Sequence, residues 1–186
     1  MIELFLKGKK AQVWVETVLY TLIGLALIGI VLGIIVPKIN ASKEKIMIEQ
    51  GNESLTVLDD KIRETLDKST GNVRIVSSFL IKKGELRINS QQDEILFVIS
   101  GLTKPYSELN TPINFGKLIV KTKEERGDIF VEISAKYDGI ANVLYDGQET
   151  EQVFSASSTK YSFSIKNEGT DEENYAKINI VENSRK

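Results

Sequence analysis

The pattern of hydrophobic and polar positions first marks out a long apolar stretch near the N-terminus. No residue from Thr17 to Val36 is charged and almost none is polar. A helix of about 20 such residues is long enough to cross the hydrocarbon core of a membrane. Pro37 follows directly. We therefore expect an apolar helix over residues 13–36.

A second pattern begins after Pro37, where apolar residues recur mostly three, four or seven positions apart, with charged residues between them. This spacing predicts an amphipathic helix over residues 38–68, the continuation of one long helix over residues 12–70 that Gly71 can end. We expect its apolar side to pack on the domain that follows, and its upper part to contact neighbouring helices if subunits assemble. The recurring residues are Ile39, Ile46, Leu55, Leu58, Ile62 and Leu66.

From Asn72 onward the apolar residues alternate with polar ones in short runs separated by turn residues. The pattern predicts a β-rich head domain over residues 72–186, an antiparallel β-sandwich-like fold, and hence an α+β chain. The expected strands lie within 73–81, 84–88, 93–100, 116–123, 128–137, 139–146, 160–167 and 174–182. Hairpins are expected at Asp138-Gly139 and Asp146-Gly147, and other reversals at Lys83-Gly84 and Glu168-Gly169.

The composition narrows the chemistry. The 186 residues include no cysteine and no histidine. Disulfides, thiolate or imidazole zinc sites, cysteine nucleophiles and histidine bases are therefore excluded, and we expect neither an enzyme nor a cofactor or metal site. The formal net charge is −2, without a long basic stripe, which argues against a nucleic-acid partner.

Lysines before the apolar stretch favour one orientation in a membrane. Lys7, Lys9 and Lys10 precede it, and positive charge on a short flank keeps that flank cytoplasmic. We expect a membrane-anchored chain with a cytoplasmic N-terminus and an extracellular C-terminal domain. The alternative is a secretory signal cut near Asn40 and Ala41, but the apolar core exceeds the usual 7 to 15 residues or so of such signals.

One carboxylate, Glu16, lies just inside the start of the apolar stretch, where an ionisable group is costly. It follows Lys9, Lys10, Ala11 and Gln12. The order of charges, a small residue, Gln and then Glu at the fifth position after the small residue resembles the class III signal peptide of archaeal type IV pilins and archaellins. Ala11 stands where glycine is more common in that family.

The resemblance implies a leader over residues 1–11, cut between Ala11 and Gln12 by a membrane aspartic prepilin peptidase. It also implies that Glu16 pairs with the freed amine of Gln12, in its own or a neighbouring subunit, as the chain enters a cell-surface filament. The implied partners are other pilin-like subunits, the pilus assembly platform and its ATPase, and membrane lipid. The family has a similar plan, a long N-terminal helix and a C-terminal β domain.

A simpler role for Glu16 stays open. A carboxylate at the membrane interface can reach water, which any single-pass anchor tolerates. The chain would then be a membrane-anchored extracellular binding module that does not polymerise.

Two smaller motifs accompany the apolar helix. Gly29 and Gly33 form a GxxxG spacing, which lets helix backbones approach closely in lipid and suits a packed filament core. Asn40 and Asn52 each begin an N-x-S triplet, the acceptor pattern for N-glycosylation on an exported segment.

Overall fold

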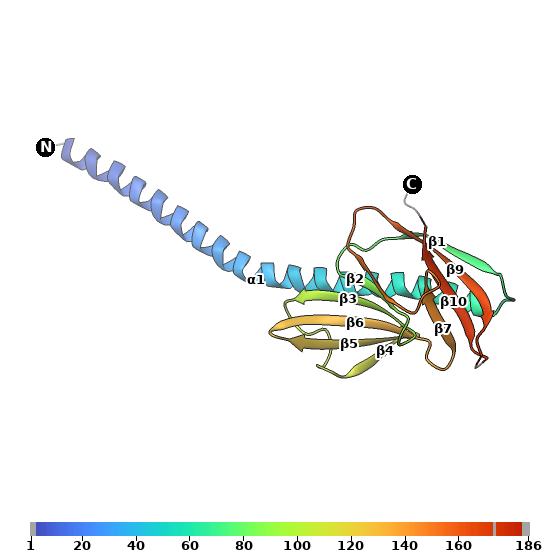
Figure 1. Cartoon of the computed structure of the whole chain (residues 1–186). Coiled ribbons are helices and arrows are strands. Elements are labelled where there is room, and N and C mark those ends of the chain that lie inside the picture. The colour runs from blue at the N-terminus through green and yellow to red at the C-terminus, as the bar shows by residue number, and fades with distance from the viewer. Residues whose placement is uncertain (1–2, 173, 184–186) are drawn as a thin grey trace. The chain divides into compact units, whose positions relative to one another are not determined.

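The computed structural model describes residues 3–172 and 174–183, with side chains from residue 13 onward. In this part of the chain one helix, α1 (Glu3–Leu66), precedes ten strands (Figure 1). The chain divides into two compact units, Met1–Lys43 and Glu44–Lys186. The strands are β1 (Val73–Phe79), β2 (Glu85–Asn89), β3 (Glu94–Leu102), β4 (Pro112–Phe115), β5 (Leu118–Glu125), β6 (Asp128–Lys136), β7 (Ala141–Tyr145), β8 (Glu151–Ser155), β9 (Tyr161–Thr170) and β10 (Ala176–Glu182).

The first unit contains the apolar part of α1. Pro37 lies inside the helix and does not end it. A proline cannot donate a hydrogen bond to the carbonyl four residues earlier, here that of Gly33, but apolar membrane helices tolerate such an interruption. The helix ends at Leu66, two residues before the predicted end of its amphipathic part.

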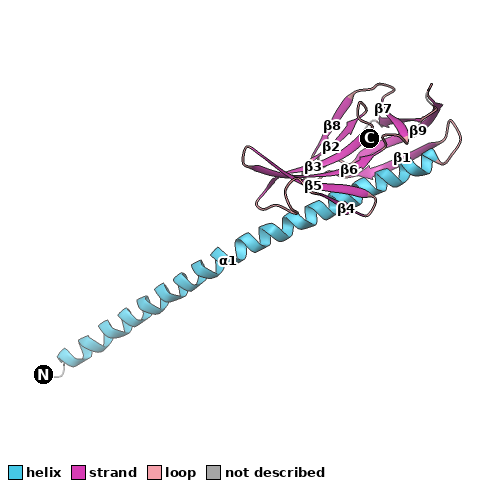
Figure 2. Ribbon diagram, turned by 90° about the horizontal axis from the view of Figure 1, so that it is seen from below, coloured by secondary structure: helices cyan, strands magenta, loops and turns pink. Residues whose placement is uncertain are grey.

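The second unit contains two sheets (Figures 1 and 2). The four-stranded sheet has the order β1-β9-β10-β7, and the six-stranded sheet has the order β4-β5-β6-β3-β2-β8. Neighbouring strands are antiparallel except for β10 and β7, which are parallel. The predicted α+β fold with a sheet sandwich-like domain is confirmed.

Each expected strand region contains a strand, whereas β4 and β8 were not predicted. Strict alternation places Tyr161, Phe163 and Ile165 of β9 inside the core, as expected. β4 and β8 are only four and five residues long, and each lies at an edge of its sheet, so their sequences carry little alternation.

The turn predictions were partly wrong, because the chain changes sheets at two of these turns. Asp138-Gly139 joins β6 to β7, and Lys83-Gly84 joins β1 to β2, strands that belong to different sheets. Asp146-Gly147 makes a tight turn closed by Tyr145 and Gln148, but β7 and β8 do not pair. Glu168-Gly169 lies inside β9, with a φ of 99° at the glycine. A turn signal in the sequence does not say whether the next strand stays in the same sheet.

The C-terminal part of α1 packs on the head, as the amphipathic pattern predicted. Leu55, Leu58 and Ile62 are fully buried in the same hydrophobic core as the strands. This part of the helix runs alongside the strands (Figure 2). Ile39 and Ile46 belong to the same predicted stripe, but they are 46% and 51% exposed. At 3.6 residues per turn these two residues lie on roughly the opposite side of the helix from Leu55, so they do not belong to the buried face.

One glycine permits the close approach of the helix to the larger sheet. A methyl group added at Gly51 would lie 2.9 Å from two ring atoms of Phe97 on β3 and 3.3 Å from Ile99. The Phe97 ring thus packs directly on the helix backbone at this position. Aromatic residues fill the middle of the core beyond it, with Phe163 in edge contact with both Phe79 and Phe154.

Candidate functional site

The apolar part of α1 exposes nearly all of its side chains. Trp14, Leu27 and Ile30 are 70%, 57% and 62% exposed, and every described residue of 13–43 is exposed except Gly24, which is half-buried. Within the described residues, α1 is the one helix long and apolar enough to cross a membrane. A helix that is apolar on all sides is covered by lipid or by other helices, not by water. This segment is therefore a candidate membrane anchor.

Glu16 lies on α1 near the start of this segment, and its side chain is exposed. The neighbouring hydroxyls are satisfied within the helix. Thr17 donates to the carbonyl of Val13 at 2.9 Å, and Thr21 donates to that of Thr17 at 2.8 Å. Back-bonding of this kind hides hydroxyls from an apolar environment. Glu16 is the ionisable group at the start of the segment.

The predicted processing residues, Lys9, Lys10, Ala11 and Gln12, lie within the helical range of α1, but their side chains are outside the described part of the chain. Residues four apart on a helix occupy the same face. Gln12 and Glu16 therefore lie one helical turn apart along α1. If the chain is cut before Gln12, the new amine stands at a helix N-terminus, where a nearby carboxylate is favourable.

The two glycines of the GxxxG spacing leave an open helix surface. A methyl group built at Gly29 or at Gly33 meets nothing within 4 Å. No described part of this chain covers these positions. The surface can therefore receive a second helix at close range, which is the use that the spacing suggests.

The two N-x-S triplets differ in their surroundings. Asn40 is exposed on α1. Asn52 is half-buried in the head, and its side-chain oxygen is buried without a hydrogen-bond partner among the described residues. A glycan requires a free amide and space around it. Of the two predicted acceptors, only Asn40 has this accessibility in the folded chain.

A buried ion pair in the head was not predicted. The Asp59 carboxylate is fully buried and accepts hydrogen bonds from Arg63 Nε at 2.8 Å and from the Tyr137 hydroxyl at 2.8 Å. Arg63 also lies over the Tyr137 ring, 5.9 Å from its centre. Burial, reinforced by the negative charge of Asp59, raises the pKa of Tyr137 far above its ordinary value. Tyr137 therefore stays neutral and donates to Asp59.

A second polar cluster closes the C-terminus of α1. The Asn167 side-chain amide donates to the carbonyls of Thr65 and Lys68 at 3.3 and 3.0 Å. The last carbonyls of a helix lack partners within the helix, so this buried asparagine of β9 caps the Thr65 carbonyl and also holds the turn that follows at Lys68. The Asn167 backbone carbonyl also accepts from Gly71 at 2.8 Å, which secures the turn into β1.

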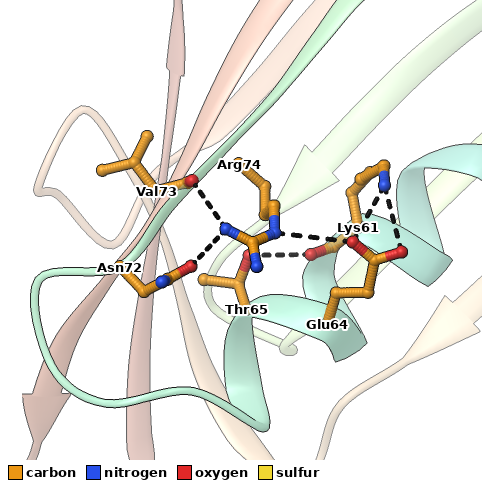
Figure 3. A network of polar contacts seen from close by, with 6 residues as sticks. All are labelled: Lys61, Glu64, Thr65, Asn72, Val73 and Arg74. Carbon is orange, nitrogen blue, oxygen red and sulfur yellow. Dashed lines mark hydrogen bonds and ion pairs between the residues drawn. The ribbon is translucent and has the colours of Figure 1, made fainter.

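Arg74 of β1 joins this turn to the helix (Figure 3). Its guanidinium donates to the Asn72 side chain at 2.7 Å and lies 3.5 Å from the Glu64 carboxylate. Lys61 lies about one helical turn before Glu64, and its Nζ is 2.8 Å from the same carboxylate. These charges lower the pKa of Glu64, with the Lys61 hydrogen bond as the main cause.

Two further contacts fix the position of α1 along the larger sheet. The Glu44 carboxylate accepts from the Thr103 backbone at 3.1 Å and from its hydroxyl at 3.0 Å. Lys117, in the turn between β4 and β5, lies 2.8 Å from Asp60. No sequence pattern indicates these pairs, because each joins residues more than 50 positions apart.

Among the described residues no three acidic side chains converge to hold a metal ion. A small cavity of about 280 Å³ lies between α1 and the β1–β2 connection, with Gly51, Leu80 and Phe97 in its lining. The titratable groups that surround it are Glu53, Lys82 and Lys83.

Comparison with protein-family models, with curated proteins and with solved structures finds no match for this chain.

Proposed function

We propose that this chain is a type IV pilin-like structural subunit of an extracellular surface filament. Prepilin peptidase cuts it between Ala11 and Gln12, and the mature chain assembles through the apolar part of α1. The observation that carries the proposal is the placement of Glu16. It is a carboxylate one helical turn beyond the proposed new N-terminus, just before the segment 17–36 of α1, which has no charged residue.

The proposed pairing gives this costly carboxylate a role. In a bundle of apolar helices the effective dielectric constant is low, so the attraction between Glu16 and the amine of Gln12 is much stronger than in water. Much of that gain is offset by desolvation of the two charges. The net effect is on register, because a subunit that enters out of register leaves both charges buried and unpaired.

A second support is that one continuous helix contains both the apolar segment and the part packed in the head. The packed part is anchored by Leu55, Leu58 and Ile62, whereas Ile46 and Val57 remain about half exposed. Ile46 and Val57 are eleven positions apart, about three helical turns, so they lie on the same outward side of the helix. They provide apolar surface for contacts between subunits above the membrane.

N-terminal sequencing of the chain extracted from membranes and from sheared surface material tests the processing step. The proposal expects a mature chain that begins at Gln12. A chain that still begins at Met1, together with a surface free of filaments, would identify the protein as an uncut single-pass anchor for an extracellular module.

The Glu16→Ala variant tests the assembly step. We expect processing to continue and filaments to be lost, as seen by electron microscopy of sheared material. Glu53→Ala is the matched control, since Glu53 is an exposed acid on the same helix within the head. Filaments of normal number from the Glu16→Ala chain would contradict the proposed role.

A further inference from the structure

The two faces of the six-stranded sheet differ in what covers them. Phe97 of β3 points to the inner face, where its ring packs on α1 at Gly51. The side chains that alternate with it point outward. On this outer face a trough of about 530 Å³, which we call the outer trough, crosses all six strands from Pro112 on β4 to Glu151 on β8. Five steps of about 4.8 Å between neighbouring strands make it about 24 Å long.

The floor of the outer trough is a row of three residues on neighbouring strands. Ile119 of β5 lies opposite Ser134 of β6, and Ser134 lies opposite Leu96 of β3. Ile119 and Leu96 are half-buried. Ser134 is only 7% exposed, and its hydroxyl has no hydrogen-bond partner among the described residues. Because a buried hydroxyl without a partner is costly, a ligand group that reaches the floor and bonds to it is favoured.

The charged residues along the trough are paired except for one lysine. Each of the three carboxylates is held by a cation: Glu132 by Lys123 at 2.8 Å, Glu94 by Lys136 at 3.8 Å, and Glu151 by Arg87 at 3.9 Å. Lys121 lies opposite Glu132 in the ladder, but no carboxylate of the described residues forms an ion pair with it. Four cations against three carboxylates leave one positive charge, and it is located at Lys121.

These features restrict the chemistry of an occupant. A nucleic acid carries a phosphate on every nucleotide, and such dense negative charge would meet three carboxylates. A lipid chain would cover the polar groups of the trough without bonding to them. The four inner strands are paired on both sides, so a peptide lying across them would find no backbone partners. A chain of neutral polar groups with sparse negative charge meets none of these objections.

We propose that the outer trough binds an acidic polysaccharide with carboxylates on only some of its sugars. Sugar hydroxyls both donate and accept hydrogen bonds, so they suit a surface of alternating ammonium and carboxylate groups. The C–H faces of the sugar rings pack on Ile119 and Leu96, and one hydroxyl bonds to Ser134. A carboxylate of the polysaccharide pairs with Lys121, which supplies a charge-assisted contact.

This binding goes beyond filament assembly and does not require it. All residues that line the outer trough belong to the strands and turns of one head, and α1 contributes none. The head would therefore bind the polysaccharide both in a filament subunit and in an uncut membrane-anchored chain.

Fluorescence anisotropy of labelled oligosaccharides tests the proposal with the full-length chain in detergent micelles. The acidic probes are oligosaccharides of hyaluronan and of unsulfated chondroitin, which carry a carboxylate on every second sugar. A maltooligosaccharide of the same length is the neutral probe. We expect at least one acidic probe to bind about tenfold more tightly than the neutral one, because only it pairs with Lys121. Absence of binding by both acidic probes, or equal affinity for all three, would overturn the proposal.

The Lys121→Ala variant locates the site. It should lower the affinity for the acidic probe by about tenfold and leave the affinity for the neutral one unchanged. Lys177→Ala is the matched control, because Lys177 is also a half-buried lysine, on β10 of the other sheet, and has no ion pair among the described residues. Its affinity should stay that of the unsubstituted chain. Equal losses in the two variants would show unspecific attraction and overturn the site.

The Ser134→Ala variant tests the floor without changing a charge. We expect weaker binding of the acidic probe with thermal stability unchanged or higher, since the hydroxyl that is removed has no partner within the chain. Unchanged affinity would show that the ligand does not reach the floor and would contradict the proposed site.

Competition distinguishes a polysaccharide from other partners. Unlabelled hyaluronan oligosaccharide should displace the probe, whereas a polyglutamate peptide and an oligodeoxythymidylate of equal length should not. Equal displacement by either of these would identify a protein or a nucleic acid as the partner and overturn the proposal. Glu16→Ala chains extracted from membranes should bind as the unsubstituted chain does, although their filaments are lost. Binding that is lost with the filaments would contradict a site within one head.

Discussion

The two parts of α1 belong to one helix but have opposite relations to their surroundings. Residues 13–36 are apolar on all sides and expose nearly every described side chain. Residues 44–66 bury one side, which carries Leu55, Leu58 and Ile62, in the core of the head, and their other side is exposed. The same backbone conformation thus arises for two reasons. In the first part it satisfies nearly all backbone groups without water, and in the second it presents one face to the sheets.

Matched residues in the two parts make this comparison testable, because each pair is chemically alike and differs in packing. Substitutions in residues 44–66 should lower the stability of the head. The corresponding substitutions in residues 13–36 should leave it unchanged and act on insertion or assembly.

The largest effect is expected from Leu58→Ala. Leu58 is fully buried in the core, so the truncation should lower the free energy of unfolding by about 3 to 5 kcal/mol. Leu27→Ala, at a position 57% exposed, is the control and should leave the unfolding of the head unchanged. Denaturant unfolding of the full-length chain in detergent measures both. Similar losses in the two variants would mean that the apolar segment also contributes to the head.

The second-largest effect is expected from Asp59→Ala, which should lower the free energy of unfolding by about 2 to 3 kcal/mol. The change removes the acceptor of two hydrogen bonds and leaves the buried Tyr137 hydroxyl without a partner. Arg63 is partly exposed and can regain water, which limits the cost. The matched acid is Glu16, and Glu16→Ala should not alter the unfolding of the head. A stable Asp59→Ala head would show that the ion pair contributes no net stability.

Gly51→Ala should lower the free energy of unfolding by about 1 to 2 kcal/mol. The new methyl group would overlap the Phe97 ring, which must move, and the better helix propensity of alanine offsets part of this cost. Gly29→Ala creates no such overlap within the chain and should leave the head unaffected. Thermal unfolding followed by near-ultraviolet circular dichroism compares the two. A more stable Gly51→Ala chain would show that the ring moves freely.

The smallest effect, about 1 kcal/mol at neutral pH, is expected from Tyr137→Phe, which removes one hydrogen bond to Asp59. Its dependence on pH is more informative. The pKa of Tyr137 is raised by folding, so the folded state keeps the phenol proton while the unfolded state loses it above about pH 10. Stability of the unsubstituted chain should fall above that pH, and the deficit of the variant should shrink. A constant deficit from pH 8 to 11 would contradict the raised pKa.

Sequence patterns located the elements well but not their partners. Period-two alternation found β9 and β10, and the helical spacing found Leu55, Leu58 and Ile62. The turn at Asp138-Gly139 was misread as a hairpin, because a turn motif fixes local backbone angles and not the sheet that receives the next strand. The sequence has no pattern that predicts the buried cluster of Asp59, Arg63 and Tyr137. A charged residue on an amphipathic helix ordinarily faces water.

The residues of the candidate site, too, were predictable from the sequence only in part. The spacing of Lys9, Lys10, Ala11, Gln12 and Glu16 is a property of the sequence, and the structure adds only the helix on which these residues lie. The contrast between an accessible Asn40 and a half-buried Asn52 could not be read from two identical motifs. It depends on which stretch of helix the head covers.

The sequence alone determined the apolar segment, the helical stretch after it and the strand-forming runs, because side-chain periodicity and hydrophobicity act locally along the chain. Tertiary structure alone decided the assignment of strands to two sheets, the burial of Asp59 and the capping of α1 by Asn167. Each of these depends on contacts between residues distant in sequence, and such contacts form only when burial of the whole core brings them together.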